Sequence, residues 1–225
     1  MQVHPLTPTS TIGGIAAAHP KSVKVFQKLG IDFCCGGKRT LDEVCASSNL
    51  AVDDVLARIA SAEQSPETQS WDEAPLNDLI DHILARHHEP LCEELPRIEG
   101  MARRVLAVHG PKDPEGLQAM VDTFLALRDD LVPHMEKEET ILFPWIRSGR
   151  GAEAQGPVRV MLLEHERVGG LLRTLRTLTN DYKAPLGACG TWRALWQAFE
   201  DLEADLHEHI HLENNILFPR ALQGG

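Results

Sequence analysis

The 225-residue sequence predicts an all-α protein in which a small helical N-terminal domain precedes an up-down four-helix bundle. Apolar residues recur at alternating steps of three and four in four long segments, the spacing of a buried helix face. Connections rich in Gly and Pro separate these segments. A polar, aperiodic stretch lies before them. It predicts a domain at 1–62, a linker at 63–70 and a bundle at 71–225.

The N-terminal part predicts short helices joined by one loop at 30–40. Thr40 followed by Glu43 has the spacing of a capping box, in which side chains and backbone groups at a helix start satisfy one another. The glycine pair at 36 and 37 permits positive φ angles and close approach of the backbone to a neighbour. We therefore expect a loop of unusual backbone geometry that leads into a helix.

Two adjacent cysteines, Cys34 and Cys35, are the chemically notable residues of that loop. Lys38 and Arg39 follow them, and nearby positive charge favours the thiolate form of cysteine. We interpret the pair as an exposed, electropositive and functional dithiol. The alternative is that both cysteines pack as small apolar residues. The three remaining cysteines are expected to be structural: Cys45, Cys92 and Cys189.

Each helix of the predicted bundle has one apolar face, and polar residues interrupt all four faces. Connections at 108–116, 149–157 and 180–190 separate the helices. In chain order the faces consist of Leu84, His88, Leu91, Leu95 and Ile98; Phe124, Leu127, Leu131, His134, Glu138 and Ile141; Val158, Met161, His165, Val168, Leu172 and Leu175; and Phe199, Leu202, Leu206, His209, Glu213 and Ile216.

An eleven-residue pattern occurs twice in the bundle, at 134–144 and at 209–219. Both copies have His first, Glu four residues later, and then Ile-Leu-Phe-Pro. Residues four apart project from one face of a helix, so each copy presents an imidazole and a carboxylate together. Another histidine lies 46 residues before the first copy and 44 before the second. The six candidate ligands are His88, His134, Glu138, His165, His209 and Glu213.

These six polar residues occupy positions that Leu, Ile, Val, Met or Phe fill elsewhere on the same faces, and this predicts a dinuclear metal site. Burying a carboxylate without a partner costs several kcal/mol, and metal coordination offsets that cost. Imidazole with carboxylate and no thiolate suits iron or manganese. If both glutamates bridge, the ligands fill about eight of twelve octahedral positions. The rest remain for an oxo or hydroxo bridge and for small molecules.

One histidine competes with this assignment. His87 also follows Ile80 and Ile83, but we prefer His88 because apolar residues continue its face. The other histidines are excluded by position. His207 and His211 are about 200° around the helix from a ligand and are expected on the outer face, His82 lies off the face, and His4, His19 and His109 lie outside the helical cores.

Three prolines lie close to the candidate ligands. The Phe-Pro pairs at 143–144 and 218–219 disfavour continued helix, so we expect each helix to end there. Pro90 lies two residues after His88 inside a predicted helix, where it removes a backbone donor and clashes with the preceding turn. We expect a kink or bulge beside that ligand.

Composition excludes several classes of function. The net charge is −11; residues 1–62 hold six Lys and Arg against five Asp and Glu, and the rest hold 16 against 28. No basic face for a nucleic acid is visible. The sequence also lacks an apolar run of about 18 residues to span a membrane, and its start has no secretory pattern. Five cysteines do not form a disulfide framework, which favours the cytoplasm.

The cysteine loop, the four bundle histidines and the two His-x-x-x-Glu motifs together resemble the RIC family, the di-iron proteins for repair of iron centres. The resemblance covers essentially the whole chain and implies a hemerythrin-like bundle with two iron ions. The family's ligands fall on the six residues named above, with both glutamates bridging, and its functional cysteines on Cys34 and Cys35. Oxygen-carrying hemerythrins have a further histidine where this chain has Gly169, which implies a more open and more labile iron.

The resemblance implies a cytoplasmic stress-response protein that restores damaged iron–sulfur proteins through labile iron and the dithiol. A non-enzymatic metal-binding role is favoured, and the question whether the protein is an enzyme stays open. The alternative is a protein that binds, scavenges or reduces nitric oxide. A third possibility is a store or sensor of oxygen or iron, but a gas store needs no reactive dithiol. A homodimer stays open.

Overall fold

Residues 6–63 and 70–224 are described by the structure, a computed structural model of the chain. Regular structure within these residues is helical, apart from an isolated bridge between Thr11 and Thr40. The all-α prediction is confirmed. None of the described helices combines the length and the apolar character needed to cross a membrane.

The chain forms two compact units, one of residues 1–81 with 207–225 and one of residues 82–206. In this grouping the end of the chain lies with its beginning, and the predicted division into 1–62, 63–70 and 71–225 stays a prediction. Residues 64–69 of the predicted linker lie outside the described part of the chain.

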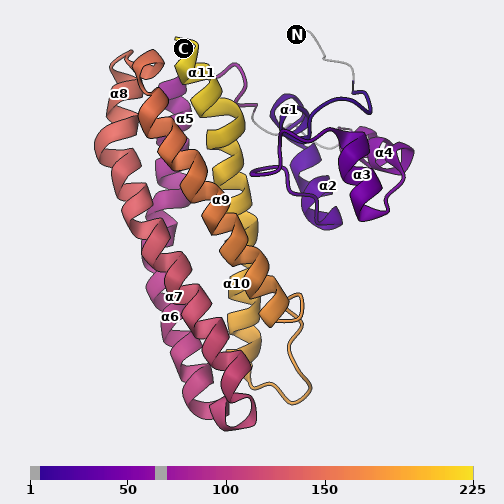
Figure 1. The fold of residues 1–225 in the computed structure, drawn as a ribbon, viewed down its shortest axis with the longest axis vertical. Coiled ribbons are helices and arrows are strands. Elements are labelled where there is room, and N and C mark those ends of the chain that lie inside the picture. The colour runs from indigo at the N-terminus through magenta and orange to yellow at the C-terminus, as the bar shows by residue number, and fades with distance from the viewer. Residues whose placement is uncertain (1–5, 64–69, 225) are drawn as a thin grey trace. The chain divides into compact units, whose positions relative to one another are not determined.

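The unit at 82–206 is a four-helix bundle of α6 (Glu89–His109), α7 (Pro114–Lys137), α9 (Gln155–Leu178) and most of α10 (Gly190–His211). These helices extend along a common direction (Figure 1). Buried apolar side chains fill the space between them, and the rings of Phe124 and Phe199 lie 5.5 Å apart between α7 and α10. The predicted bundle is confirmed.

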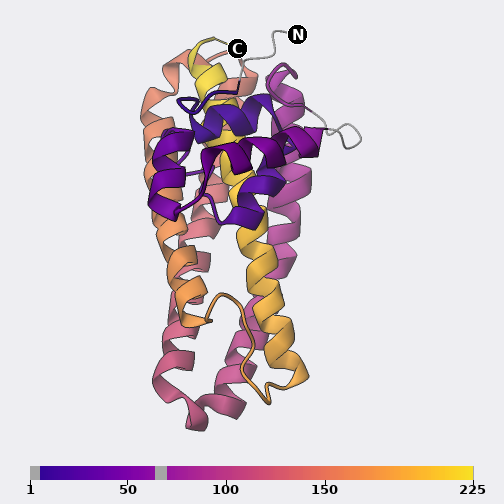
Figure 2. The same cartoon turned by 90° about the vertical axis from the view of Figure 1, so that its right-hand side faces the viewer.

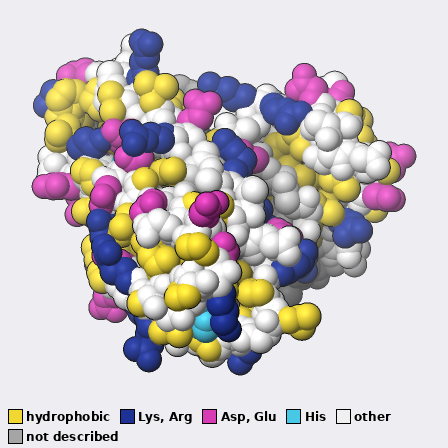
Figure 3. All heavy atoms as spheres, turned by 60° about the horizontal axis from the view of Figure 1, so that its bottom comes forward, with side chains coloured by type: hydrophobic (Ala, Val, Ile, Leu, Met, Phe, Trp, Pro, Cys, Tyr) yellow, Lys and Arg dark blue, Asp and Glu magenta, His cyan; other side chains and the backbone are white. Residues whose placement is uncertain are grey.

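Short helices complete the bundle's connections. A 3₁₀ turn at Gly110–Lys112 links α6 to α7, and α8 (Phe143–Arg147) with a second 3₁₀ turn at Gly151–Glu153 links α7 to α9. The end of the bundle that is turned forward in Figure 3 carries basic and acidic side chains interspersed with one another.

The other unit begins with four short helices: α1 (Ile12–Ala18), α2 (Ser22–Leu29), α3 (Leu41–Ser48) and α4 (Val52–Glu63). The four helices cluster together in both ribbon views (Figures 1 and 2), and their buried apolar side chains form one core. Phe26 and Phe33 stack in that core with ring centroids 6.2 Å apart. The predicted capping box opens α3, where the Thr40 N–H donates to Glu43 Oε2 at 3.0 Å.

The same unit contains α5 (Leu76–Ile83) for most of its length and, at the end of the chain, α11 (Phe218–Leu222). A hydrogen bond joins α11 to the segment before α5, since Arg220 Nη1 donates to the carbonyl of Trp71 at 2.8 Å. The helical backbone is continuous from Gly190 to Leu222, through α10, a π-helical segment and α11.

Within residues 6–63 and 70–224, three π-helical segments interrupt the helices: η1 (Leu84–His88), η3 (Glu138–Leu142) and η5 (Leu212–Leu217). A proline follows two residues after the end of each of them, at Pro90, Pro144 and Pro219. A proline cannot donate to the carbonyl four residues back and clashes with it in regular α-helix. A wider turn placed directly before the proline relieves that clash.

This arrangement tests the proline predictions. The bulge expected beside Pro90 is confirmed by η1. The expectation that the helices end at the two Phe-Pro pairs is wrong, because helix continues as α8 and α11 with the proline at its second position. The extra residue in each π turn accommodates the proline without ending the helix.

The π segments also shift which residues face the core. Ile141, predicted on the apolar face, is 45% exposed, whereas the next residue, Leu142, is 1% exposed. Leu84 is only half-buried, and Ile80 and Ile83 are fully buried in its place. A π turn holds one residue more than the α-helical repeat, so a face extrapolated through it slips by one position.

Candidate metal centre

The six predicted ligands are buried, each with at most 1% of its surface exposed. They lie in the helices α7, α9 and α10 and in the three π-helical segments. His88 ends η1, His134 lies in α7, Glu138 begins η3, His165 lies in α9, His209 lies in α10 and Glu213 lies in η5.

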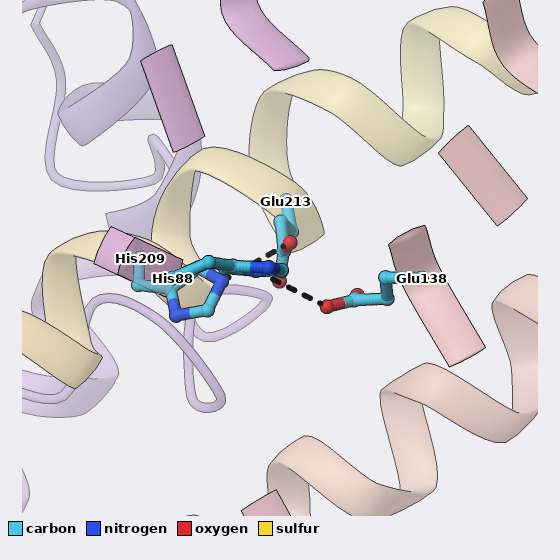
Figure 4. A group of neighbouring side chains, drawn as sticks. All are labelled: His88, Glu138, His209 and Glu213. Carbon is cyan, nitrogen blue, oxygen red and sulfur yellow. Dashed lines mark ion pairs between the residues drawn. The ribbon is translucent and has the colours of Figure 1, made fainter. Parts of the chain in front are cut away.

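These side chains form two overlapping groups of four potential ligands, and within each group one donor atom per residue lies within 4.8 Å of the others. One group joins His88 and His209 to Glu138 and Glu213, and Figure 4 shows these four side chains converging. The other group joins the histidine pair 134 and 165 to the same two glutamates. The two carboxylates are thus shared between two pairs of imidazoles, and both groups consist of residue types that bind metal ions in helical bundles.

Short distances connect the ligands within each motif. Glu138 Oε2 lies 3.4 Å from His134 Nε2 and 3.6 Å from His88 Nε2. Glu213 Oε1 lies 3.2 Å from His209 Nε2. Each carboxylate is therefore directed at the Nε2 atom of the histidine four residues before it, as the spacing predicts.

His165 approaches from the regular helix α9, and its Nε2 atom lies 2.9 Å from Nε2 of His134. Two nitrogens bound to one ion at about 2.0–2.1 Å, with a right angle between the bonds, lie about 2.9 Å apart. The two imidazoles are therefore spaced as neighbouring ligands of one metal ion. Gly169, four residues after His165, is buried in α9 and contributes no side chain there.

Carboxylates behind the histidines fix which ring nitrogen faces the centre. His88 Nδ1 lies 2.8 Å from Glu139 Oε1, and His134 Nδ1 lies 2.8 Å from Glu164 Oε2. A carboxylate accepts, so Nδ1 donates its proton and Nε2 keeps the lone pair that binds metal. Glu139 and Glu164 could not be predicted as partners of the histidines, because neither residue belongs to the repeated motif or to an apolar helix face.

Glu164 is itself held by a cation. Burial raises the pKa of its carboxyl, but hydrogen bonds from Lys137 and His134 outweigh burial, so the pKa lies below its ordinary value. An ionised carboxylate at this position keeps the His134 imidazole oriented.

The competing histidine, His87, is also fully buried. Its Nδ1 atom lies 3.1 Å from Asp205 Oδ1, and it belongs to neither group of potential ligands among the described residues. The π turn of η1 explains why sequence alone left the two histidines ambiguous, since it buries His87 and His88 side by side.

The cysteine loop differs from its prediction. Cys34 is 3% exposed, and only Cys35 is partly accessible. The pKa of the Cys34 thiol is raised well above its ordinary value by its hydrogen bond to Cys35, by burial and by the Asp32 carboxylate. The expectation of an exposed, electropositive thiolate is wrong for Cys34, because the nearest charge is negative. Arg39 turns away and donates to Glu43 O and Ser47 Oγ.

The other cysteines divide by burial. Cys45 is buried in the N-terminal core, as its structural role requires. Cys92 and Cys189 are exposed, so the expectation that they pack structurally is wrong.

His211 is the largest departure from the predicted outer face. It is 2% exposed, and its ring lies 5.5 Å from that of Phe33 in an edge-on contact. Burial lowers the pKa of His211 to about 4, although hydrogen bonds to the backbone at Phe33 and Ala16 act in the opposite direction. Residues of the N-terminal part, Phe33 and Ala16, lie against this histidine, and periodicity within one helix cannot reveal such a contact.

Two asparagines of η5 bind the cysteine loop from the same side. Asn215 Nδ2 donates to the carbonyl of Phe33 at 3.1 Å, and Asn214 Nδ2 donates to the carbonyl of Cys34 at 3.4 Å. A Cβ atom at Gly37 would lie 2.9 Å from Asn215 Oδ1, closer than real Cβ contacts allow, so the loop requires glycine there. The residue after candidate ligand Glu213 therefore contacts the cysteine loop directly.

Comparison with known proteins agrees with this geometry. A family model described as the hemerythrin HHE cation binding domain matches residues 79–221, and a domain of unknown function (DUF542) matches residues 8–63. The iron-sulfur cluster repair protein YtfE of Yersinia pseudotuberculosis serotype IB (strain PB1/+) is 43% identical over 217 residues, which cover 95% of this chain and 97% of that protein. The protein of the same name from Yersinia pestis (strain Pestoides F) has the same identity and coverage.

A helical bundle that directs four histidines and two shared glutamates at one centre is a hemerythrin-type cation-binding protein, with the donor set of a non-haem iron site. The chain belongs to the RIC family of iron–sulfur cluster repair proteins, as the motifs predict.

Proposed function

We propose that this protein takes part in the repair of iron–sulfur clusters damaged by nitrosative or oxidative stress. The observation that carries the proposal is that one RIC-family chain combines a buried four-histidine, two-glutamate centre with a dithiol loop. The relatives named as iron–sulfur cluster repair proteins are 43% identical to this chain, and the match covers nearly their whole length. Damaged iron–sulfur proteins are accordingly its proposed partners. Cytoplasmic location stays a prediction.

Within this proposal the centre holds two iron ions. His88 and His209 would hold one ion, and His134 and His165 would hold the other. Glu138 and Glu213 would be shared by both ions, because they belong to both groups of potential ligands. Bound there, iron would supply an exchangeable metal with open coordination positions for a small ligand.

The chain's own residues keep the centre assembled and dry. Glu139 and Glu164 accept the Nδ1 protons of their histidines and so hold Nε2 toward the ions. The ring of Phe143 lies 5.8 Å from that of His88, and such apolar cover limits solvent access. The backbone at Gly169 leaves a position without an imidazole, which favours exchange of iron over permanent retention.

Nitric oxide binding, with scavenging or reduction, is the second candidate function. The observation that favours it is the same vacant ligand position at Gly169 in a buried centre, because a small neutral ligand suits an open, apolar site. This function would not require the cysteine loop, and the two candidates can therefore be separated.

The test is restoration of a purified iron–sulfur enzyme whose cluster has been damaged by nitric oxide or peroxide. The iron-loaded protein, the Cys34→Ala/Cys35→Ala variant and a Cys45→Ala control are compared, and binding of nitric oxide to each is followed by absorption. We expect restoration by the parent and the control, and loss of restoration with unchanged nitric oxide binding in the double variant.

Two outcomes would contradict parts of the proposal. Full restoration by the double variant would refute the role of the dithiol and leave the repair function standing. Failure of the parent protein to restore the enzyme, together with tight nitric oxide binding, would favour the scavenging function.

A further inference from the structure

We propose that Asp32, Cys34 and Cys35 form a second metal site, separate from the histidine–glutamate centre, which takes a single thiophilic divalent cation through two thiolates and one carboxylate. The inference rests on the proposed repair function and deepens it, because it gives the dithiol a defined cargo, one ferrous ion. One donor atom from each of the three residues lies within 4.8 Å of the others.

The spacing of the donors already fits one ion. Cys34 Sγ lies 3.7 Å from Cys35 Sγ and 3.3 Å from Asp32 Oδ1. Two sulfurs at about 2.3 Å from one ion, with a tetrahedral angle between the bonds, are about 3.8 Å apart. A sulfur and a carboxylate oxygen at about 2.1 Å are about 3.6 Å apart in the same geometry. The two separations that involve Cys34 Sγ therefore lie within a few tenths of an ångström of the values expected around one ion.

Two sets of hydrogen bonds hold the loop that carries the donors. Asp32 Oδ1 accepts the N–H groups of Cys35 at 2.9 Å, Gly36 at 3.0 Å and Cys34 at 3.2 Å. Asn214 and Asn215 of η5 donate to the loop's carbonyls. A site whose donors are ordered before binding loses little conformational entropy when the ion enters.

Access to the site is one-sided. Cys34 is buried, whereas Asp32 and Cys35 are partly exposed, so an ion enters over the latter two side chains. Three protein donors leave the fourth tetrahedral position open to a donor from outside. An open position on an accessible side suits transfer of an ion to a partner, which the buried histidine centre cannot make directly.

Charge and proton balance are consistent with this chemistry. As the two metal–sulfur bonds form, both thiols lose their protons to solvent, and no atom changes oxidation state. Two thiolates and a carboxylate then place three negative charges around the divalent cation, so the occupied site has a net charge of −1. The negative environment of Cys34, which disfavours a bare thiolate, favours a bound cation.

Cobalt(II) provides the test, because thiolate ligation gives it an intense charge-transfer absorption. The full-length protein, with its histidine–glutamate centre already loaded with iron, is reduced and titrated with cobalt(II) without oxygen. We expect one further equivalent per chain, with charge-transfer absorption and release of two protons.

Variants assign the donors. Cys34→Ser and Cys35→Ser should abolish the charge-transfer absorption of the tetrahedral site, and Asp32→Asn should weaken cobalt binding at least tenfold. Asparagine keeps an oxygen acceptor for the loop's N–H groups, so this variant separates metal ligation from loop folding. Cys45→Ser and Cys92→Ser are matched controls, one buried and one exposed, and should titrate like the parent.

Absence of a cobalt–thiolate absorption in the reduced parent would overturn the site, and unchanged affinity in Asp32→Asn would overturn its carboxylate ligand. Failure of the second metal site is distinguishable from failure of the repair function. Cobalt binding without restoration of a damaged enzyme would support the site and refute repair. Restoration without cobalt binding would support repair and refute the site.

Discussion

Two buried carboxylates govern the chemistry of the bundle at the scale of residues. Glu138 and Glu213 have no solvent exposure, and each belongs to both groups of potential ligands. Desolvating a carboxylate costs several kcal/mol unless cations or donors compensate. Two cations between them would meet that cost, and the histidines around them supply the remaining bonds.

Replacing either carboxylate should therefore weaken iron binding. We expect Glu138→Ala and Glu213→Ala each to lose at least tenfold in iron affinity, since loss of even an outer partner of a ligand typically costs about 10–100-fold. The iron-loaded protein should also melt at a lower temperature, because bound metal stabilises the folded state by mass action. Metal analysis and thermal unfolding measure both effects. Glu136→Ala and Glu208→Ala, exposed on the same helices, are controls that should bind about two irons per chain. Parent-like affinity in both carboxylate variants would rule out bridging.

The cysteines should differ in reactivity according to their burial. Iodoacetamide at neutral pH should modify Cys92 and Cys189 at least tenfold faster than Cys34, because Cys34 is buried and its raised pKa leaves little thiolate. Mass spectrometry of peptides after timed labelling measures the rates. Faster labelling of Cys34 than of Cys92 would show that the loop opens in solution.

At the scale of elements, the π segments place the ligands. Glu138 begins η3 and Glu213 lies second in η5, and His88 ends η1. Such segments frequently mark functional sites, since they re-aim side chains within an otherwise regular helix. The bulge beside Pro90 could be predicted because a proline inside a helix requires relief. The two others were missed because a proline after phenylalanine also fits a helix end.

The prolines should stabilise these turns. Alanine at position 144 has a backbone N–H that can form the hydrogen bond of a regular α-helix. In Pro144→Ala a regular α-helical turn therefore competes with η3, and it changes the rotation of Glu138 relative to the residues that follow it. We expect iron loss to a chelator to become several-fold faster with little change in helical circular dichroism. Pro157→Ala is the matched control, since Pro157 lies near the start of α9 with no π segment before it. Equal chelation rates for the two variants would show that proline does not maintain the turn.

At the scale of the whole molecule, the end of the chain groups with its beginning. η5 and α11 share a unit with the N-terminal helices, and His211 and Asn215 contact the loop around Phe33. The helix that carries His209 and Glu213 is thus packed by a segment that contributes none of the six bundle ligands.

A fragment beginning at Trp71 tests this dependence. All six candidate ligands lie within it, so we expect it to fold and to bind iron. It should nevertheless melt several degrees lower than the full chain, because removal of the N-terminal helices exposes the buried side of η5. Calorimetry of the iron-loaded fragment and full chain measures the difference. Identical melting temperatures would mean that the contacts with η5 contribute nothing to stability.

Sequence by itself determined the helical bundle, the capping box and the six polar positions on apolar faces, because these depend on spacing along single helices. Tertiary structure decided what depends on residues distant in the chain: the carboxylates behind the histidines, the choice between His87 and His88, the burial of Cys34 beside Asp32 and the covering of His211. It also decided the helical phase after each π turn, since one extra residue in a turn rotates every later side chain and only packing against other helices selects that turn.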